Sequence, residues 1–220
     1  MISFKKISMI GLLTLSALPA SPAWAQAISN TSLNAQLLVA ARQGDAVAVQ
    51  QALSRGAAAN SRNRLGKTVL LIAAERGQMA MARAALSAGA DVNLASIERV
   101  TPLMAACYGG NLALVRDLLD AGARTDALDH LHKPAIVYAA GQGHAEVVGL
   151  LLDRGVPADG IYQNQLTALM WAAGQGSVAA TRLLLERGAR ADLRDDRGLS
   201  AADIARQAGH LAAVALFDGR

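Results

Sequence analysis

Few residues in this 220-residue chain are of types and spacings that could do chemistry. His130 and His132 could place two imidazoles near one another, but they lack the further protein ligands that a zinc site needs. Cys107 is the only cysteine, and no companion base stands beside it to form a nucleophile. Asp195 and Asp196 are adjacent and are more typical of a turn than of an acid–base pair. We therefore expect no catalytic residue, no metal site, no cofactor and no enzyme activity.

Recognition is the chemistry that the aromatic residues suggest instead. Aromatic side chains make up only 3% of the chain, so the placement of Tyr108, Tyr138, Tyr162 and Trp171 is informative. Tyr and Trp dominate the binding energy of many protein interfaces. What these side chains can do depends on the elements that hold them.

Those elements repeat along the chain with a period of 33 residues. One series of glycines recurs at that spacing without a break, and a second series follows it twelve residues later. The first series comprises Gly44, Gly77, Gly110, Gly143, Gly176 and Gly209, and the second comprises Gly56, Gly89, Gly122, Gly155 and Gly188.

Each repeat contains two short apolar segments that read as helices. Ala and Leu dominate the apolar residues, which favours helix over strand. A glycine follows each segment, where a chain leaving a helix often takes a left-handed conformation. The prediction is an all-α solenoid of six 33-residue helix-turn-helix units joined by short β-hairpin-like loops.

This pattern resembles the ankyrin-repeat family, whose repeat has the same length and opens its first helix with Thr-Pro-Leu-His. The corresponding openings begin at Thr68, Thr101, Pro134, Thr167 and Ser200, with a degenerate copy near Ala35. The family's turn Gly-Ala-Asp-x-Asn appears at residues 89–93. The resemblance implies that stacked units bury a shared core and that the end units cap it.

Two departures from the family pattern concern the openings and the turns before them. The opening histidine is replaced in the inner units by Leu71, Met104, Val137 and Met170, for which we expect apolar contacts. The glycine in the turn before the opening is kept at Gly66 and Gly198. In the three central connections it is replaced by Arg99, His132 and Gln165. We therefore expect these central turns to be less regular.

The first residues are typical of a secretory signal peptide. Lys5 and Lys6 precede an apolar stretch at residues 7–18, and small residues follow at Ala23 and Ala25. That stretch is well short of the roughly 20 residues of a membrane-spanning helix. We therefore predict cleavage after Ala25, a bacterial periplasmic location and no stable membrane anchor.

The predicted organisation has three parts. Residues 1–25 form the signal peptide, residues 26–33 a short leader, and residues 34–220 the repeat domain, with repeats beginning near 35, 68, 101, 134, 167 and 200. We expect a monomer.

The charge of the chain argues against a nucleic-acid partner. Once Lys5 and Lys6 are removed with the signal peptide, 19 basic and 17 acidic residues remain. A net charge of +2 spread along the chain provides no phosphate-binding stripe.

The resemblance implies that the concave side, formed by the first helices and the hairpin tips, binds another protein, here a periplasmic one. The candidates on the helices are Glu75, Arg76, Tyr108, Tyr138, Gln142, Trp171 and Gln175. The candidates on the tips are Arg64, Lys67, Ile97, Glu98, His130, Leu131, Lys133, Gln163, Asn164 and Arg197.

Two questions stay open at this level. Tyr138 and Trp171 share one repeat position and should lie side by side near Tyr108, either contacting a partner or filling interior space. The function is either that of an adaptor, inhibitor or immunity-type binder, or that of a small-molecule or metal-handling protein using the central concavity.

Overall fold

The computed structural model describes residues 23–218 and contains twelve α-helices and no strand within that range. The first helices of successive pairs are α1 (Ala23–Gln43), α3 (Val69–Glu75), α5 (Pro102–Gly109), α7 (Ala135–Gly141), α9 (Ala168–Gly174) and α11 (Ala201–Gln207). The second helices are α2 (Ala46–Ser54), α4 (Met79–Ser87), α6 (Leu112–Asp120), α8 (Ala145–Asp153), α10 (Val178–Glu186) and α12 (Leu211–Val214). A short 3-10 helix, η1, spans Gln163–Gln165.

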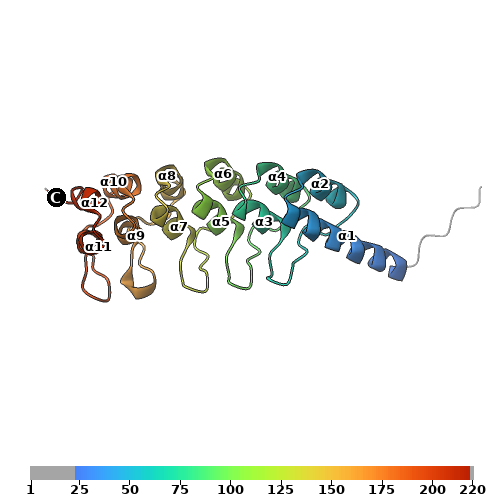
Figure 1. The fold of residues 1–220 in the computed structure, drawn as a ribbon, viewed down its shortest axis with the longest axis horizontal. Helices are drawn as coiled ribbons and strands as arrows, with labels where there is room; N and C mark the ends of the chain where they lie inside the picture. The colour runs from blue at the N-terminus through green and yellow to red at the C-terminus, as the bar shows by residue number, and fades with distance from the viewer. Residues whose placement is uncertain (1–22, 219–220) are drawn as a thin grey trace, which may run out of the picture.

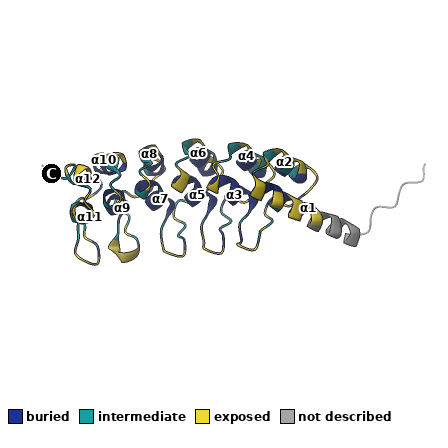
Figure 2. Ribbon diagram, viewed as in Figure 1, coloured by how far each residue is buried: buried dark blue, intermediate teal, exposed yellow. Residues whose placement is uncertain are grey.

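The helix pairs stack into an elongated solenoid with two layers. Figure 1 shows the first helices in one row, the second helices in a parallel row, and the connecting loops projecting to one side of the first row. We call these projections tips 1 to 5, at residues 62–67, 95–100, 128–133, 161–166 and 194–199. Most of the buried residues (dark blue in Figure 2) lie on the helices, whereas the tips are largely exposed.

Side-chain caps begin most of the first helices. The hydroxyl groups of Thr68, Thr101, Thr167 and Ser200 each accept a hydrogen bond from the backbone N–H three residues later. Pro134 stands at the equivalent position before α7 and provides no side-chain cap. The register of the first helices is thus fixed by the predicted openings.

Tight backbone packing explains one glycine of the first series. Gly110 ends α5 with a φ of 68°, a left-handed conformation that glycine adopts without a steric cost. A Cβ atom there would lie 2.4 Å from the ring of His144, in the next unit. His144 in turn contacts the Tyr108 carbonyl oxygen through Nε2 at 3.0 Å, so it holds two units together.

The positions of the missing opening histidine are filled by buried apolar side chains, as predicted. Leu71, Met104, Val137 and Met170 are each at most 2% exposed. Cys107 is also fully buried, and burial raises the pKa of its thiol well above the usual range.

The central tips are more regular than their missing glycine predicts. Arg99 and His132 take the left-handed conformation of Gly66 and Gly198, with φ of 60° and 56°. Tips 2 and 3 close through the same backbone hydrogen bonds as tips 1 and 5. Only tip 4 differs, because Asn164 as well as Gln165 has a φ of 59° and forms the turn of η1.

A side-chain acceptor accounts for this difference. The first residue of the turn is Asn63 in tip 1, Ser96 in tip 2, Asp129 in tip 3 and Asp195 in tip 5, and its side-chain oxygen accepts a hydrogen bond from the N–H four residues later. Tyr162 stands at this position in tip 4 and cannot form that local bond.

The helix α1 is longer than the other first helices. It runs from Ala23 to Gln43, so the residues predicted to form a leader, 26–33, are helical. Residues 1–22, which hold most of the predicted signal peptide, lie outside the described range. Among the described helices, none has the length and apolar character needed to cross a bilayer.

Candidate functional site

The central part of the first-helix row, with its tips, brings most of the predicted binding residues onto one side of the molecule. Tyr108 lies at the end of α5, Tyr138 on α7 and Trp171 on α9, so three consecutive units contribute an aromatic side chain. We call the surface formed by these first helices and by the tips the tip face.

Tyr108 and Tyr138 form a ring pair across two units. Their ring centroids lie 6.2 Å apart with an interplanar angle of 77°, an edge-to-face contact. Tyr108 is 55% exposed, whereas Tyr138 is half-buried against the core. Tyr138 therefore packs against the core with part of its side chain and contributes the rest to the surface.

A buried carboxylate orients Tyr138. The Tyr138 hydroxyl donates a short hydrogen bond to Oδ2 of Asp129, and Oδ1 of Asp129 accepts from the N–H groups of Leu131 and Lys133, both at 2.8 Å. Burial, the hydrogen bond to Asp129 and the charges of Asp129 and Glu98 all raise the pKa of Tyr138. The phenol is thus held neutral and fixed in direction.

Trp171 has a cation as its neighbour. The Lys133 ammonium lies 4.7 Å from the Trp171 ring centroid, a cation–π contact. Tyr138 and Trp171 share one register position, but the described aromatic rings form only the Tyr108–Tyr138 pair. The expected close grouping of three rings is therefore a ring pair next to a separate lysine–tryptophan pair.

A cavity of about 280 Å³ opens beside the tyrosine pair. Its lining comes from three consecutive units and consists of Glu75, Val100, Met104, Ala105, Tyr108 and Tyr138. The hollow exists because Ala105 holds the register position that Tyr138 and Trp171 fill in the next two units. We call it the tyrosine pocket.

One ion pair and one histidine–carboxylate contact lie near the tyrosine pocket. The Lys67 ammonium lies 2.7 Å from Oε1 of Glu75, and Nδ1 of His130 lies 3.2 Å from Oε2 of Glu98. The second pair is largely exposed, so its contribution to stability is small.

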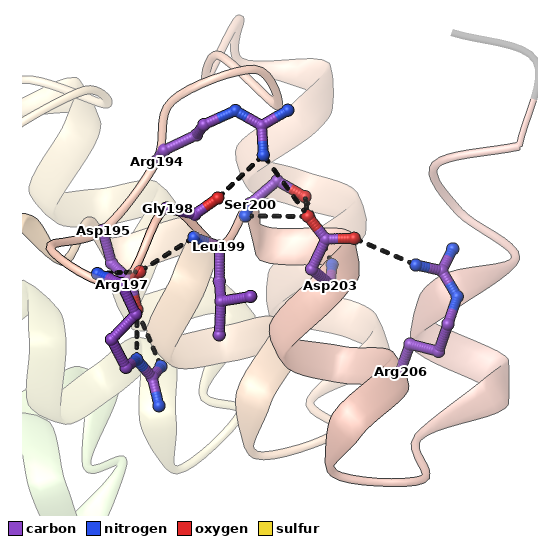
Figure 3. A network of polar contacts seen from close by, with 8 residues as sticks. All are labelled: Arg194, Asp195, Arg197, Gly198, Leu199, Ser200, Asp203 and Arg206. Atoms are coloured by element: carbon purple, nitrogen blue, oxygen red, sulfur yellow. Dashed lines mark hydrogen bonds and ion pairs between the residues drawn. The ribbon is translucent and has the colours of Figure 1, made fainter.

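The other predicted binding residues are exposed, and two of them, Arg76 and Arg197, also make structural contacts. Arg76 donates a hydrogen bond to the Arg42 carbonyl oxygen at 2.7 Å and so links two units. Arg197 binds the buried carboxylate of Asp195 through Nε and Nη2 in tip 5 (Figure 3). The remaining exposed positions are Arg64, Ile97, Leu131, Gln142, Gln163, Asn164 and Gln175.

Three residues of the site were not predicted from the sequence. Val100 and Met104 line the tyrosine pocket, and Asp129 orients Tyr138. A usable signal for Asp129 was present, because Asn63, Ser96, Asp129 and Asp195 recur at multiples of 33 residues with acceptor side chains. No comparable signal marks Val100 and Met104, which look like ordinary core residues in the sequence.

Potential metal ligands do not cluster in the described part of the chain. No three side chains of His, Cys, Asp or Glu gather there in a geometry that could hold a metal ion. Charged side chains gather at tip 5 and the start of α11, where Asp203 accepts hydrogen bonds from Ser200 and Arg206 (Figure 3).

Comparison with known proteins places this geometry in context. The family model described as "Ankyrin repeats (3 copies)" matches residues 37–129 and again residues 136–217. The crystal structure of EF0377, an ankyrin repeat protein, superposes with a TM-score of 0.76 at 28% sequence identity, covering 84% of this chain and 96% of that one. No curated protein matches the sequence.

Proposed function

Because this chain belongs to the family of ankyrin-repeat proteins, we propose that it binds another protein through its tip face. Ankyrin repeats are generic protein–protein interaction modules, and most are not enzymes. We interpret the chain as six such repeats, with the first and last as caps, acting as a monomeric adaptor, inhibitor or immunity-type binder in the bacterial periplasm.

The observation that carries the proposal is the exposed apolar and aromatic surface on one side of consecutive units. Tyr108 is 55% exposed beside the tyrosine pocket, and Ile97 is 66% exposed on the neighbouring tip. Polar tip residues surround them, as a polar rim surrounds the apolar centre of a typical interface. Exposed apolar patches on a protein surface often mark sites where another protein binds.

The alternative function, binding of a small molecule, has a weaker basis in the same surface. The tyrosine pocket, at about 280 Å³, is slightly smaller than the roughly 300–1,000 Å³ of typical ligand sites. Its size suits one side chain of a partner better than a whole metabolite.

Affinity capture from periplasmic extract tests the proposal. The bait is the purified protein, whose intact mass also tests cleavage after Ala25. The variant combines Ile97→Ser and Tyr108→Ala, both at exposed positions, and the matched control is Val47→Ser, which is 65% exposed on α2. We expect one specific protein to be retained by the wild type and the control and lost by the variant. Retention of that protein by all three would contradict binding through the tip face.

A further inference from the structure

Trp171 and Tyr138 occupy the same position in consecutive repeats but have different neighbouring side chains. Lys133 precedes Trp171 by 38 residues and places its ammonium over the indole ring. The same offset from Tyr138 leads to Val100, which lines the tyrosine pocket next to that ring. Where Trp171 has the Lys133 ammonium as its companion, Tyr138 in the preceding unit therefore has a short apolar side chain and an open hollow.

The tyrosine pocket is suited to a cation in its electrostatics as well. Glu75 lines it, and the negative charges of Glu98 and Asp129 act on Tyr138 from the adjacent tips. Aromatic faces attract ammonium and guanidinium groups, and a carboxylate beside the rings strengthens that attraction.

The molecule already shows what Glu75 binds. Both of its carboxylate oxygens lie within 3.0 Å of the Lys67 ammonium. A carboxylate offers about four lone-pair sites, so one lysine does not exhaust it. Glu75 is also about one-third exposed, which leaves it accessible from the pocket.

From these observations we propose that the tyrosine pocket receives a basic side chain, an arginine or a lysine, of the partner protein. The cation takes the place over Tyr138 that Lys133 takes over Trp171, and it shares Glu75 with Lys67. This inference rests on the proposed binding function, and it specifies a positively charged anchor residue on the partner.

Titration with a single-residue probe tests the pocket without the partner. The purified protein is titrated at low salt with Nα-acetyl-arginine amide, and two-dimensional NMR follows the amide groups around Tyr108 and Tyr138. The neutral analogue Nα-acetyl-citrulline amide is the control ligand. We expect saturable millimolar binding of the arginine probe, with shifts confined to the pocket, and no saturation with citrulline.

Variants then identify the groups responsible. Val100→Lys places an internal ammonium beside Tyr138 and should abolish saturation, whereas Val100→Met, similar in length but uncharged, should leave the affinity within about twofold. Glu75→Gln should weaken binding by about fivefold, as expected for the loss of one partly exposed charge contact. Lys67→Met removes the resident competitor for Glu75 and should tighten binding.

The outcomes separate this inference from the proposed function. Saturation with arginine alone that is lost in Val100→Lys and weakened in Glu75→Gln supports the basic anchor. The absence of saturable shifts, or equal shifts with citrulline, overturns it, while the capture experiment with Tyr108→Ala still decides whether the tip face binds a protein. If Val100→Lys does not fold, Glu75→Gln and Lys67→Met carry the test.

Discussion

Buried carboxylates organise two of the tips. Asp129 and Asp195 occupy equivalent positions, and each accepts two backbone N–H groups through Oδ1. They differ in what the second oxygen binds, which is the Tyr138 hydroxyl for Asp129 and the Arg197 guanidinium for Asp195. One local motif thus orients an aromatic ring in the centre of the tip face and a cation near its end.

The hydroxyl of Tyr138 can be tested alone. Tyr138→Phe keeps the ring but leaves Oδ2 of the buried Asp129 without a donor, so we expect the free energy of unfolding to fall by about 1–3 kcal/mol. Urea denaturation followed by circular dichroism measures it. Tyr108→Phe is the control, because that tyrosine is more than half exposed and should change the stability little. Equal losses in the two variants would show that the bond to Asp129 contributes nothing.

Asp195 makes stability depend on pH. Burial raises its pKa, but hydrogen bonds from Leu199 and Arg197, with the Arg197 charge, lower it more, so the pKa lies below its usual value. A lowered pKa contributes stability that is present above the unfolded-state value of about 3.9 and is lost as the pH falls through the folded-state value.

Asp195→Asn isolates this charge, because Asn63 already forms the same turn in tip 1. We expect the variant to be less stable than the wild type at pH 7 and the difference to shrink at pH 3, as measured by urea denaturation at both pH values. Asp196→Asn, at the exposed next position, should show no such convergence. A difference between wild type and Asp195→Asn that is the same at both pH values would contradict the assignment.

At the scale of elements, backbone conformation in the tips is partly independent of glycine. Gly198 and Arg99 hold equivalent positions with φ of 77° and 60°. An L-residue with a side chain is strained by roughly 1–2 kcal/mol in this region. Tip 2 therefore carries a strain that its hydrogen bonds offset.

Exchanging these residues should change stability in opposite directions. Gly198→Ala should lower the free energy of unfolding by about 1 kcal/mol from conformation alone, because no atom lies within 4 Å of the added Cβ. Arg99→Gly should raise it by about 0.5 kcal/mol, the strain relieved less the flexibility gained by the unfolded chain. Thermal and urea unfolding measure both. Arg64→Gly, at a tip position without a positive φ, should be destabilising, and a stabilising result there would contradict the argument.

The sequence predicts the helices well because their signals are local. A threonine or serine cap at the start of a helix and a glycine at its end each act within one helical turn. The openings at Thr68, Thr101 and Thr167 therefore locate helices directly. The shape of the tips is less predictable. The absence of the turn glycine predicted irregular central tips. Ser96 and Asp129 nevertheless preserve the turn in two of these tips through side-chain hydrogen bonds.

The candidate site is predictable in its residues but not in its contacts. The repeat register places Tyr108 near Tyr138, and the rings do meet. The pairing of Trp171 with Lys133 depends on where the end of tip 3 directs a long flexible side chain, which no local pattern specifies. The hollow over Ala105 likewise appears only when the neighbouring units are in place.

At the scale of the whole molecule, the solenoid is held together by contacts that repeat from unit to unit, and one junction lacks two of them. The loops after the second helices are joined by side-chain oxygens that accept the N–H of the next loop. Between α6 and α8 this bond is missing, because Pro157 has no N–H to donate to Asp126. The tips of the same two units also lack the backbone hydrogen bond that joins Leu65 to Ile97 and Glu98 to His130.

Figure 1 shows the corresponding wider gap between tips 3 and 4. A cavity of about 410 Å³ opens there between the two tips. The junction is still joined by the contact of His144 with the Tyr108 carbonyl and by the ion pair of Arg154 with Asp120. We expect it to be the most compliant place in the stack, and it lies next to the tyrosine pocket.

Alanine substitutions in the loop series test this unequal coupling. Asn93 accepts the Arg124 N–H at 2.9 Å and donates to the Gly122 carbonyl, so Asn93→Ala should lower the free energy of unfolding by about 1–2 kcal/mol. Asp126 is at the equivalent position and binds the exposed Arg124 side chain rather than the next loop, so Asp126→Ala should have a much smaller effect. Urea denaturation compares them, and Asp159→Ala, which breaks the bond to the Arg190 N–H, serves as a second coupled position. Since stability in a solenoid is approximately a sum of unit and junction contributions, equal losses at Asn93 and Asp126 would show that Pro157 does not weaken the central junction.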